Sequence, residues 1–238
     1  MHRFYVPELG APGTAAPLPP EEGQHLRRVL RLDAGAAVRV FDGRGREHEA
    51  SVETLTRDGA ILRIGPPADA APEPGVHVTL AQALLKADKF DAVVRDATML
   101  GAARVQPLVT AHVEAPRGAR GGRVERWRRV AISSAKQCGR AVVPEIADPL
   151  RLDECLRIAD RPLVLLAEPA AGAGAGAIPS RPAAATIVCG PEGGWAPGEI
   201  AAAIDAGASP ITLGGRTLRA DAAPLVALAI LLHHWDAF

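Results

Sequence analysis

The chain has 238 residues, a length that suits one large domain or two small ones. Hydrophobic residues make up 48% of it, which is enough for a packed core and excludes wholesale disorder. The 27 basic and 27 acidic side chains cancel, and aromatic residues, at 3%, are too few for a broad base-stacking platform.

Short strands separated by turn signals occupy the first part of the chain. Apolar runs over 37–65, broken by DGRG at 42–45 and by DG at 58–59, predict a β meander. The stretch PPADAAPEPG at 66–75 is typical of a linker. The sequence therefore predicts a small β-barrel-like domain over residues 1–70. A small basic cluster in this domain comprises His25, Arg27, Arg28 and Arg31.

From residue 75 onward, strands alternate with helices. Strands are expected at 76–81, 105–109, 163–167, 186–189 and 211–213, and helices at 86–100, 123–139, 197–206 and 221–235. Several of the strands are unpatterned apolar runs, which indicate a parallel sheet covered on both faces. The sequence therefore predicts an α/β domain over residues 75–238.

Basic residues concentrate in the middle of the chain. Residues 117–140 hold eight basic side chains and one acidic one, whereas the flanking parts are neutral to acidic. On a helical wheel, the face opposite the apolar stripe carries Arg126, Arg129, Lys136, Gln137 and Arg140. Charge runs are usually solvated faces, but the near absence of acids here favours contact with RNA or DNA phosphates.

A glycine-rich loop, GPEGG at 190–194, directly follows a predicted strand, which is where open α/β sheets bind ligands. Its glycines let a ligand approach the backbone, and the carboxylate of Glu192 suits a neutral or cationic ligand better than a triphosphate. A plain strand-to-helix turn is the alternative. The GAGAGA run at 172–177 imitates a dinucleotide-binding fingerprint, but the surrounding prolines leave no helix N-terminus, so a surface loop is favoured.

The loop LGGRTLRAD at 213–221 leads from the last predicted strand into an apolar helix. Asp221 is placed to cap that helix, while Arg216 and Arg219 need an acidic partner or a substrate if they lie near the core. The segment 222–232 is apolar on every side, which predicts burial all round. It is either a central core helix or a subunit interface beside a ligand site.

No segment predicts secretion or a membrane span. The N-terminus has no apolar signal region, and the longest apolar run, 222–232, is shorter than the roughly 20 residues that cross a bilayer. The three cysteines are widely spaced and the histidines lack zinc-binding spacing, so neither a disulfide framework nor a metal site is expected. These features predict a soluble cytoplasmic protein.

Several segments carry a family resemblance in chain order. They are VLRL at 29–32, FDGRG at 41–45, LAQALLKADKFD at 80–91, LG at 100–101, QPL at 106–108, RW at 126–127, QCGR at 137–140, VPE at 143–145, GPEGG at 190–194 and LGGRTLR at 213–219. Together they resemble the bacterial 16S rRNA uridine-N3 methyltransferases of the RsmE type, within the SPOUT methyltransferases. The match covers nearly the whole chain, and the last two motifs at this spacing are highly specific.

The resemblance implies an N-terminal PUA-like β-barrel for RNA and a C-terminal SPOUT α/β domain with a deep trefoil knot at about 163–238. It also implies a homodimer that uses S-adenosylmethionine to methylate uracil N3 of a uridine in 16S rRNA of the assembled small ribosomal subunit. The implied cofactor residues are Ala167, Glu168, Gly190, Glu192, Gly193, Gly194, Leu213, Gly214, Arg216 and Leu218.

Methylation at N3 requires the N3 proton to leave and the uracil carbonyl oxygens to be stabilised as they gain charge. Arg219 is the candidate for stabilising that charge and Asp221 for assisting proton removal, with bulk water as the alternative base. The two basic clusters would contact RNA. A SPOUT ribose 2′-O-methyltransferase and a non-catalytic ribosome-assembly factor remain the alternative functions.

The chain departs from the family pattern in three places. Met99 stands where the family usually has Glu, residues 220–222 read Ala-Asp-Ala where it has Thr-Glu-Thr, and residues 24–25 read Gln-His where it has a His pair. At the second place Asp221 retains the carboxylate on a side chain one methylene shorter.

Overall fold

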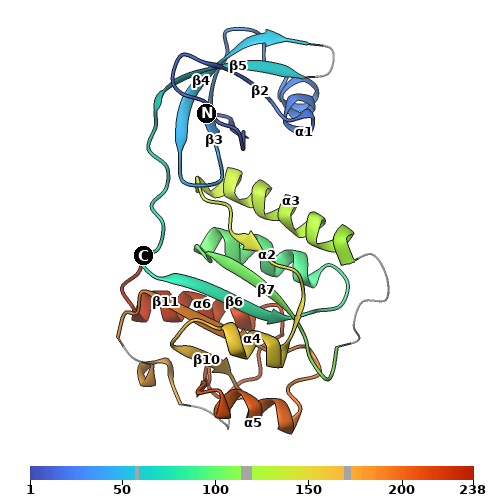
Figure 1. Cartoon of the computed structure of the whole chain (residues 1–238), viewed down its shortest axis with the longest axis vertical. Coiled ribbons are helices and arrows are strands. Elements are labelled where there is room, and N and C mark those ends of the chain that lie inside the picture. Colours follow the sequence, from blue (N-terminus) through green and yellow to red (C-terminus); the bar gives the residue numbers. More distant parts are fainter. Residues whose placement is uncertain (57–58, 114–119, 169–172, 179) are drawn as a thin grey trace. The chain divides into compact units, whose positions relative to one another are not determined.

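The computed structural model describes residues 1–56, 59–113, 120–168, 173–178 and 180–238 (Figure 1). The chain divides into two compact units. Unit 1 comprises Met1–Pro72 and Ile132–Val143, and unit 2 comprises Glu73–Ala131 and Pro144–Phe238. The sequence assigned all of 75–238 to one domain, so the segment 132–143 is where the observed units differ from the expected division.

Unit 1 is built on a five-stranded sheet. Its strands are β1 (Arg3–Tyr5), β2 (Ala15–Pro17), β3 (Ala37–Phe41), β4 (Glu47–Leu55) and β5 (Ala60–Pro67), in the order β1-β3-β4-β5-β2. β1 runs parallel to β3, and the other neighbours are antiparallel. Strands β3 to β5 confirm the predicted meander, although residues 57–58 of its second turn lie outside the described residues.

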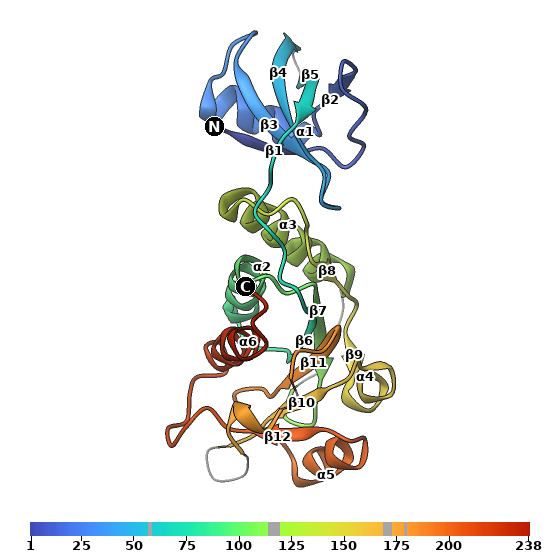
Figure 2. The ribbon, with the colours of Figure 1, turned by 90° about the vertical axis from the view of Figure 1, so that its left-hand side faces the viewer.

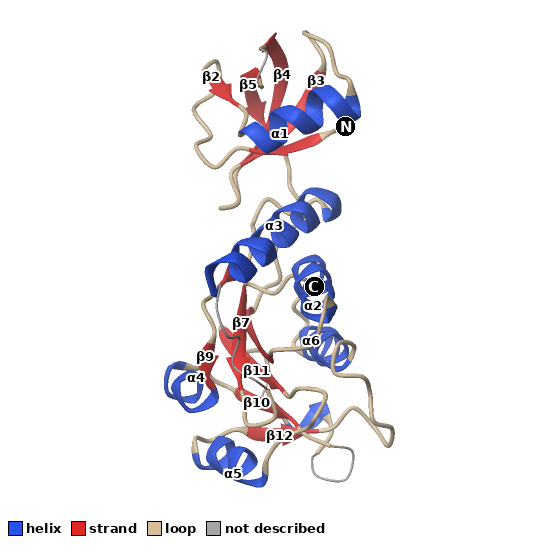
Figure 3. Ribbon diagram, turned by 90° about the vertical axis from the view of Figure 1, so that its right-hand side faces the viewer, coloured by secondary structure: helices blue, strands red, loops and turns tan. Residues whose placement is uncertain are grey.

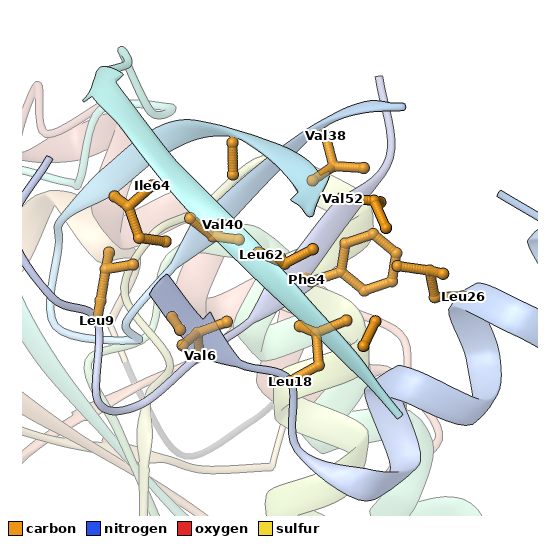
Figure 4. Packing of buried hydrophobic residues seen from close by; sticks show 13 residues of the cluster. Phe4, Val6, Leu9, Leu18, Leu26, Val38, Val40, Val52, Leu62 and Ile64 are labelled. Atoms are coloured by element: carbon orange, nitrogen blue, oxygen red, sulfur yellow. The ribbon is translucent and has the colours of Figure 1, made fainter. Parts of the chain in front are cut away.

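The core of unit 1 packs against a short helical segment. Helix α1 (Pro20–Gln24) continues into a π-helical turn, η1 (His25–Leu30), whose buried residue is Leu26. Leu26 packs with Phe4 of β1 and Leu62 of β5 in a cluster of thirteen buried residues (Figure 4). Because Leu26 takes the inward position, the polar side chains next to it in η1 remain outside the core.

The segment 132–143 completes unit 1 through polar and apolar contacts. Arg3 Nη1 donates hydrogen bonds to the carbonyl oxygens of Ala135 at 2.7 Å and Lys136 at 3.0 Å. The side chains of Ala135 and Ala141 pack with Phe41 at the end of β3. These partners are about a hundred residues away in sequence, so a local sequence pattern does not reveal that 132–143 belongs to this unit.

Unit 2 contains a seven-stranded sheet in which every pairing is parallel. Its strands are β6 (His77–Ala83), β7 (Arg104–Val109), β8 (Glu145–Ile146), β9 (Leu150–Arg151), β10 (Leu163–Leu166), β11 (Ala184–Cys189) and β12 (Ser209–Ile211). The order is β12-β10-β11-β6-β7-β8, with β9 also paired to β7. This confirms the predicted parallel sheet. The trefoil knot at about 163–238 stays a prediction.

Helices cover both faces of that sheet, as Figures 2 and 3 show. α2 (Lys89–Leu100) and α6 (Ala223–His234) lie on one face, and α4 (Leu152–Ile158) and α5 (Pro197–Asp205) lie on the other. α3 (Arg120–Cys138) is shared between the units, since its residues up to Ala131 belong to unit 2 and the rest to unit 1. Among the described residues, none of the helices combines the length and the apolar character needed to cross a bilayer.

One predicted feature of the C-terminal region differs from the structure. α6 is not buried all round within one chain, because Val226 and Ile230 keep 37% and 39% of their surface exposed. In the GAGAGA run, residue 172 lies outside the described residues, and the later part forms a single 3₁₀ turn without buried residues, η2 (Ala175–Ala177), in agreement with the predicted surface loop.

Candidate functional site

A cavity of about 460 Å³ lies at the carboxyl ends of three neighbouring strands of unit 2. Its walls come from the segments that follow β10, β11 and β12, together with the start of α2. Parallel strands that are adjacent in a sheet end at the same edge, so loops far apart in sequence meet there.

The cavity gathers most of the predicted site residues. From the cofactor set it is lined by Ala167, Glu168, Gly190, Glu192, Gly193, Gly194, Leu213, Arg216 and Leu218. The two candidate catalytic residues, Arg219 and Asp221, also line it. Gly214 is not among the lining residues. It lies at a bend of the loop after β12, where its φ of +105° favours glycine.

Sequence reasoning missed several residues of the cavity wall, chiefly Lys89, Trp195 and Thr212. Lys89 lies in a stretch that carried the family resemblance, but it is about a hundred residues from the glycine-rich loop. No local spacing connects it with that loop. Trp195 directly follows the GPEGG motif, and this position is the one feature of the sequence that indicates its place in the cavity wall.

The glycine-rich loop 190–194 has little room for side chains. A Cβ on Gly190 would lie 3.1 Å from the ring of Trp195, whose Nε1 donates a 2.9 Å hydrogen bond to the carbonyl oxygen of Leu166. A Cβ on Gly193 would lie 3.0 Å from the Cβ of His112. These contacts explain why glycine is needed at both positions.

Glu192 is the central carboxylate of this loop. Its Oε1 accepts hydrogen bonds from Lys89 Nζ at 2.9 Å and from the backbone N–H of Lys86 at 3.3 Å. Burial raises the pKa of Glu192, but these hydrogen bonds outweigh it and hold the pKa below its ordinary value. Glu192 is therefore ionised at neutral pH and presents a negative charge at the cavity.

Arg219 and Asp221 bind each other in the loop before α6. Arg219 Nε donates a 3.0 Å hydrogen bond to Asp221 Oδ1, and Arg219 Nη2 donates one of 3.0 Å to Asp221 Oδ2. These bonds hold the pKa of Asp221 below its ordinary value and raise that of Arg219. The predicted helix cap is wrong, because α6 begins at Ala223 after Ala222 and the Asp221 carboxylate is taken by Arg219.

The predicted basic face of α3 is only partly exposed. Arg129 and Gln137 are exposed, and Arg126 is exposed but forms an ion pair with Asp91. Lys136 is half-buried in unit 1, where its Nζ lies 2.7 Å from a carboxylate oxygen of Glu22. Arg140 is buried, so the prediction that it lies on an exposed face is wrong. The cause is the packing of 132–143 into unit 1, which covers the end of the helix.

The second basic cluster is exposed on unit 1. His25, Arg27 and Arg28 lie on the outer side of η1, and Arg31 follows it with a left-handed φ of +54°. Arg27 Nη1 donates a hydrogen bond of 2.5 Å to the carbonyl oxygen of Thr56. Within the part of the chain that the structure describes, no group of three or more His, Cys, Asp or Glu side chains is arranged to hold a metal ion.

Comparison with known proteins defines the class of this fold and cavity. Residues 72–232 match the family model of the RNA methyltransferase domain. Residues 18–65 match the family model of the RNA methyltransferase PUA domain. The architecture is thus that of an RNA methyltransferase with a PUA domain preceding its α/β domain.

Full-length relatives narrow the assignment. The ribosomal RNA small subunit methyltransferase E of Synechocystis sp. is 36% identical over 213 residues, spanning 86% of this chain and 68% of the relative. That of Mycobacterium bovis is 34% identical, spanning 98% and 93%. The crystal structure of the Neisseria gonorrhoeae enzyme, bound to S-adenosyl methionine, superposes with a TM-score of 0.91 at 30% identity, spanning 99% and 98%. The chain belongs to the ribosomal RNA small subunit methyltransferase E family, which confirms the resemblance and the fold class expected from sequence.

Proposed function

We propose that this protein transfers a methyl group from S-adenosylmethionine to N3 of a uracil in 16S rRNA, acting on the assembled small ribosomal subunit in the cytoplasm. The observation that carries the proposal is the cavity at the ends of β10, β11 and β12. It combines an accessible glycine-rich backbone with both carboxylate and guanidinium groups.

Three properties of the cavity suit S-adenosylmethionine. Its volume of about 460 Å³ lies within the range of small-molecule sites. Gly190 and Gly193 line the cavity, and residues without a side chain let a ligand approach the main chain closely. The ionised Glu192 attracts a cationic ligand. When bound, S-adenosylmethionine supplies an electrophilic methyl group on a positively charged sulfur.

The residues proposed to hold the cofactor belong to the three loops. They are Ala167, Glu168, Gly190, Glu192, Gly193, Gly194, Leu213, Gly214, Arg216 and Leu218. Except for Gly214, those on the loops after β11 and β12 line the cavity from the two strands that flank β10, which favours one ligand bridging them.

Arg219 and Asp221 are proposed to face the uracil. The guanidinium of Arg219 is a donor for a carbonyl oxygen that gains negative charge, while Asp221 accepts a hydrogen bond from N3–H. Arg219 lowers the pKa of Asp221, which makes that carboxylate a weak base at neutral pH. Water is therefore the final acceptor of the N3 proton in this proposal.

Ribosomal RNA is proposed to bind to the exposed basic residues of both units. On unit 1 these are His25, Arg27, Arg28 and Arg31, and on α3 they are Arg126 and Arg129, with the neutral amide of the exposed Gln137 as a further contact. Lys136 and Arg140 were expected to join them, but their burial assigns them to the packing of unit 1 instead. Phosphate contacts of this kind give affinity that weakens steeply with salt.

The active form is proposed to be a homodimer that pairs through α6. Val226 and Ile230 expose an apolar strip on this helix, and burying such surface yields about 25 cal/mol per Å². A second copy of the chain is the partner that would cover it.

Nucleoside mass spectrometry of 16S rRNA from a deletion strain tests the activity. We expect N3-methyluridine to disappear and to return when the wild-type gene is supplied. Loss of a ribose 2′-O-methyl group instead would indicate the related SPOUT activity. Unchanged nucleosides together with a defect in subunit assembly would indicate a non-catalytic factor.

A further inference from the structure

Lys89 places an ammonium group in the cavity wall, within electrostatic reach of two carboxylates. It is the first residue of α2, and its Nζ lies 2.9 Å from Glu192 Oε1. After Arg219, its charge also contributes to lowering the pKa of Asp221, which lies in the loop before α6. The Lys89 side chain is 34% exposed.

The turn before α2 has a strained backbone. Ala87 adopts a left-handed φ of +54°, which costs a non-glycine residue roughly 1–2 kcal/mol. Its neighbour Lys86 donates its backbone N–H to the same oxygen of Glu192 that Lys89 binds. Strain of this kind persists where the surroundings enforce it, and it clusters at active sites.

Positive charge close to the base favours methylation at uracil N3. When the N3 proton leaves, negative charge spreads over N3 and both carbonyl oxygens. Arg219 is already bound at two points by Asp221, and its side chain is 73% exposed, so solvent screens it strongly. The less exposed ammonium of Lys89 acts with less screening on a base in the cavity.

We propose that Lys89 is a further catalytic residue, whose ammonium contacts a uracil carbonyl oxygen and stabilises the charge that develops there during methyl transfer. The inference rests on the proposed function, because it requires a uracil in this cavity. In the step, the N3 proton passes to water and the N3 electron pair forms the bond to the methyl carbon. The electrons of the carbon–sulfur bond leave with the sulfur, and Lys89 stays protonated throughout.

Three carboxylates and two guanidinium groups accompany Lys89 in the cavity. Glu192 and Asp221 lie within reach of its charge, and Arg219 compensates Asp221. Glu168, in the loop after β10, and Arg216, in the same loop as Arg219, complete the charged lining. Removing the ammonium leaves Glu192 uncompensated, which disfavours an anionic uracil and favours a cationic cofactor. Rate and cofactor affinity should therefore change in opposite directions.

The test uses Lys89→Met in the full-length protein, with isolated small subunits that lack the methyl group as substrate. We expect the single-turnover rate at pH 7 to fall by about 10²-fold, the usual loss for one oxyanion donor. The deficit should shrink as pH rises, because the imide then ionises without help. In calorimetry, Lys89→Met should bind S-adenosylmethionine at least as tightly as the wild-type protein does. Its preference for S-adenosylmethionine over S-adenosylhomocysteine, which lacks the sulfonium charge, should be retained or increased. Lys89→Arg should keep most of the rate.

Glu192→Gln separates a direct role of Lys89 from an indirect one. If Lys89 acts on the uracil, removing the Glu192 charge should shift the alkaline limb of the rate profile to lower pH and weaken S-adenosylmethionine binding. Both changes are opposite to those of Lys89→Met. Arg95→Gln, an equal loss of charge on the exposed side of α2, is the matched control for rate, binding and melting temperature.

The proposal is overturned if Lys89→Met methylates at the wild-type rate at pH 7. It is also overturned if rate and cofactor affinity fall together with an unchanged pH profile, since Lys89 would then act only by holding Glu192. Failure of the proposed function has a different signature, because the wild-type protein itself would then form no N3-methyluridine on the subunits.

Discussion

At the scale of single residues, Gly193 lets the glycine-rich loop 190–194 pack closely against His112. A Cβ there would lie 3.0 Å from the Cβ of His112, so a branched side chain must displace either His112 or the loop. We expect Gly193→Val to abolish S-adenosylmethionine binding in calorimetry while the melting temperature stays within a few degrees. Gly198→Val, at a position with nothing within 4 Å, is the control. Normal binding by Gly193→Val would remove this loop from the site.

The cysteines also differ in their surroundings. Burial raises the pKa of Cys155 to about 11, and Cys189 is buried with its pKa raised further. Cys138 is partly exposed. Because the thiolate is the reactive form, we expect iodoacetamide at pH 8 to modify Cys138 first in the native protein. Peptide mass spectrometry checks this order, and all three thiols should react equally in denaturant. Early modification of Cys189 would contradict the packing of β11.

At the scale of elements, α3 separates binding from stability. Arg129 is exposed in its first half, so Arg129→Glu should leave the free energy of unfolding within about 0.5 kcal/mol. It should weaken binding to small subunits and flatten the dependence on salt by roughly one unit per lost phosphate contact. Arg157→Glu on α4 is the control, because it makes the same change of charge at an exposed site outside α3 and should leave binding unchanged. Filter binding at several salt concentrations compares the two variants with the wild-type protein. Equal affinities of Arg129→Glu and wild type for the subunits would mean that this face of α3 is solvated and does not bind RNA.

Lys136→Glu in the second half of α3 should act on stability instead. Its Nζ pairs with the half-buried Glu22 and lies 5.5 Å from the ring centre of Phe4, so a carboxylate there faces another carboxylate. We expect urea denaturation to give a loss of about 1–3 kcal/mol. Lys136→Met, which keeps the apolar stem, should lose less. A fully stable Lys136→Glu protein would show that this contact contributes little.

The elements also show what sequence patterns could and could not predict. The meander at 37–65, the parallel sheet and the GPEGG loop follow from patterns that lie within one segment. By contrast, β8, β9 and α4 are too short for a clear period, and η1 has no distinctive sequence signal. The pairing of Lys89 with Glu192 and the burial of Arg140 depend on contacts between residues about a hundred positions apart. A helical wheel describes one helix and does not predict such contacts.

At the scale of the whole molecule, α6 determines the expected assembly. Light scattering at micromolar concentration should give about twice the 24.7 kDa mass of the chain. Ile230→Asp places a charge on the exposed apolar strip, so it should give a folded monomer with an unchanged circular dichroism spectrum. Phe238→Asp, also at an exposed apolar residue, should stay dimeric. A wild-type monomer, or a dimeric Ile230→Asp variant, would refute pairing through α6.

The membership of 132–143 in unit 1 has a consequence for biosynthesis. On the ribosome, residues 1–72 emerge first, but Arg3 and Phe41 find their partners Ala135 and Ala141 only after about seventy more residues are made. At about 5–20 residues per second this delay lasts several seconds. The sheet of unit 1 therefore lacks its contacts with 132–143 during this part of translation. A fragment that ends at the linker, residues 66–75, would lack these contacts permanently.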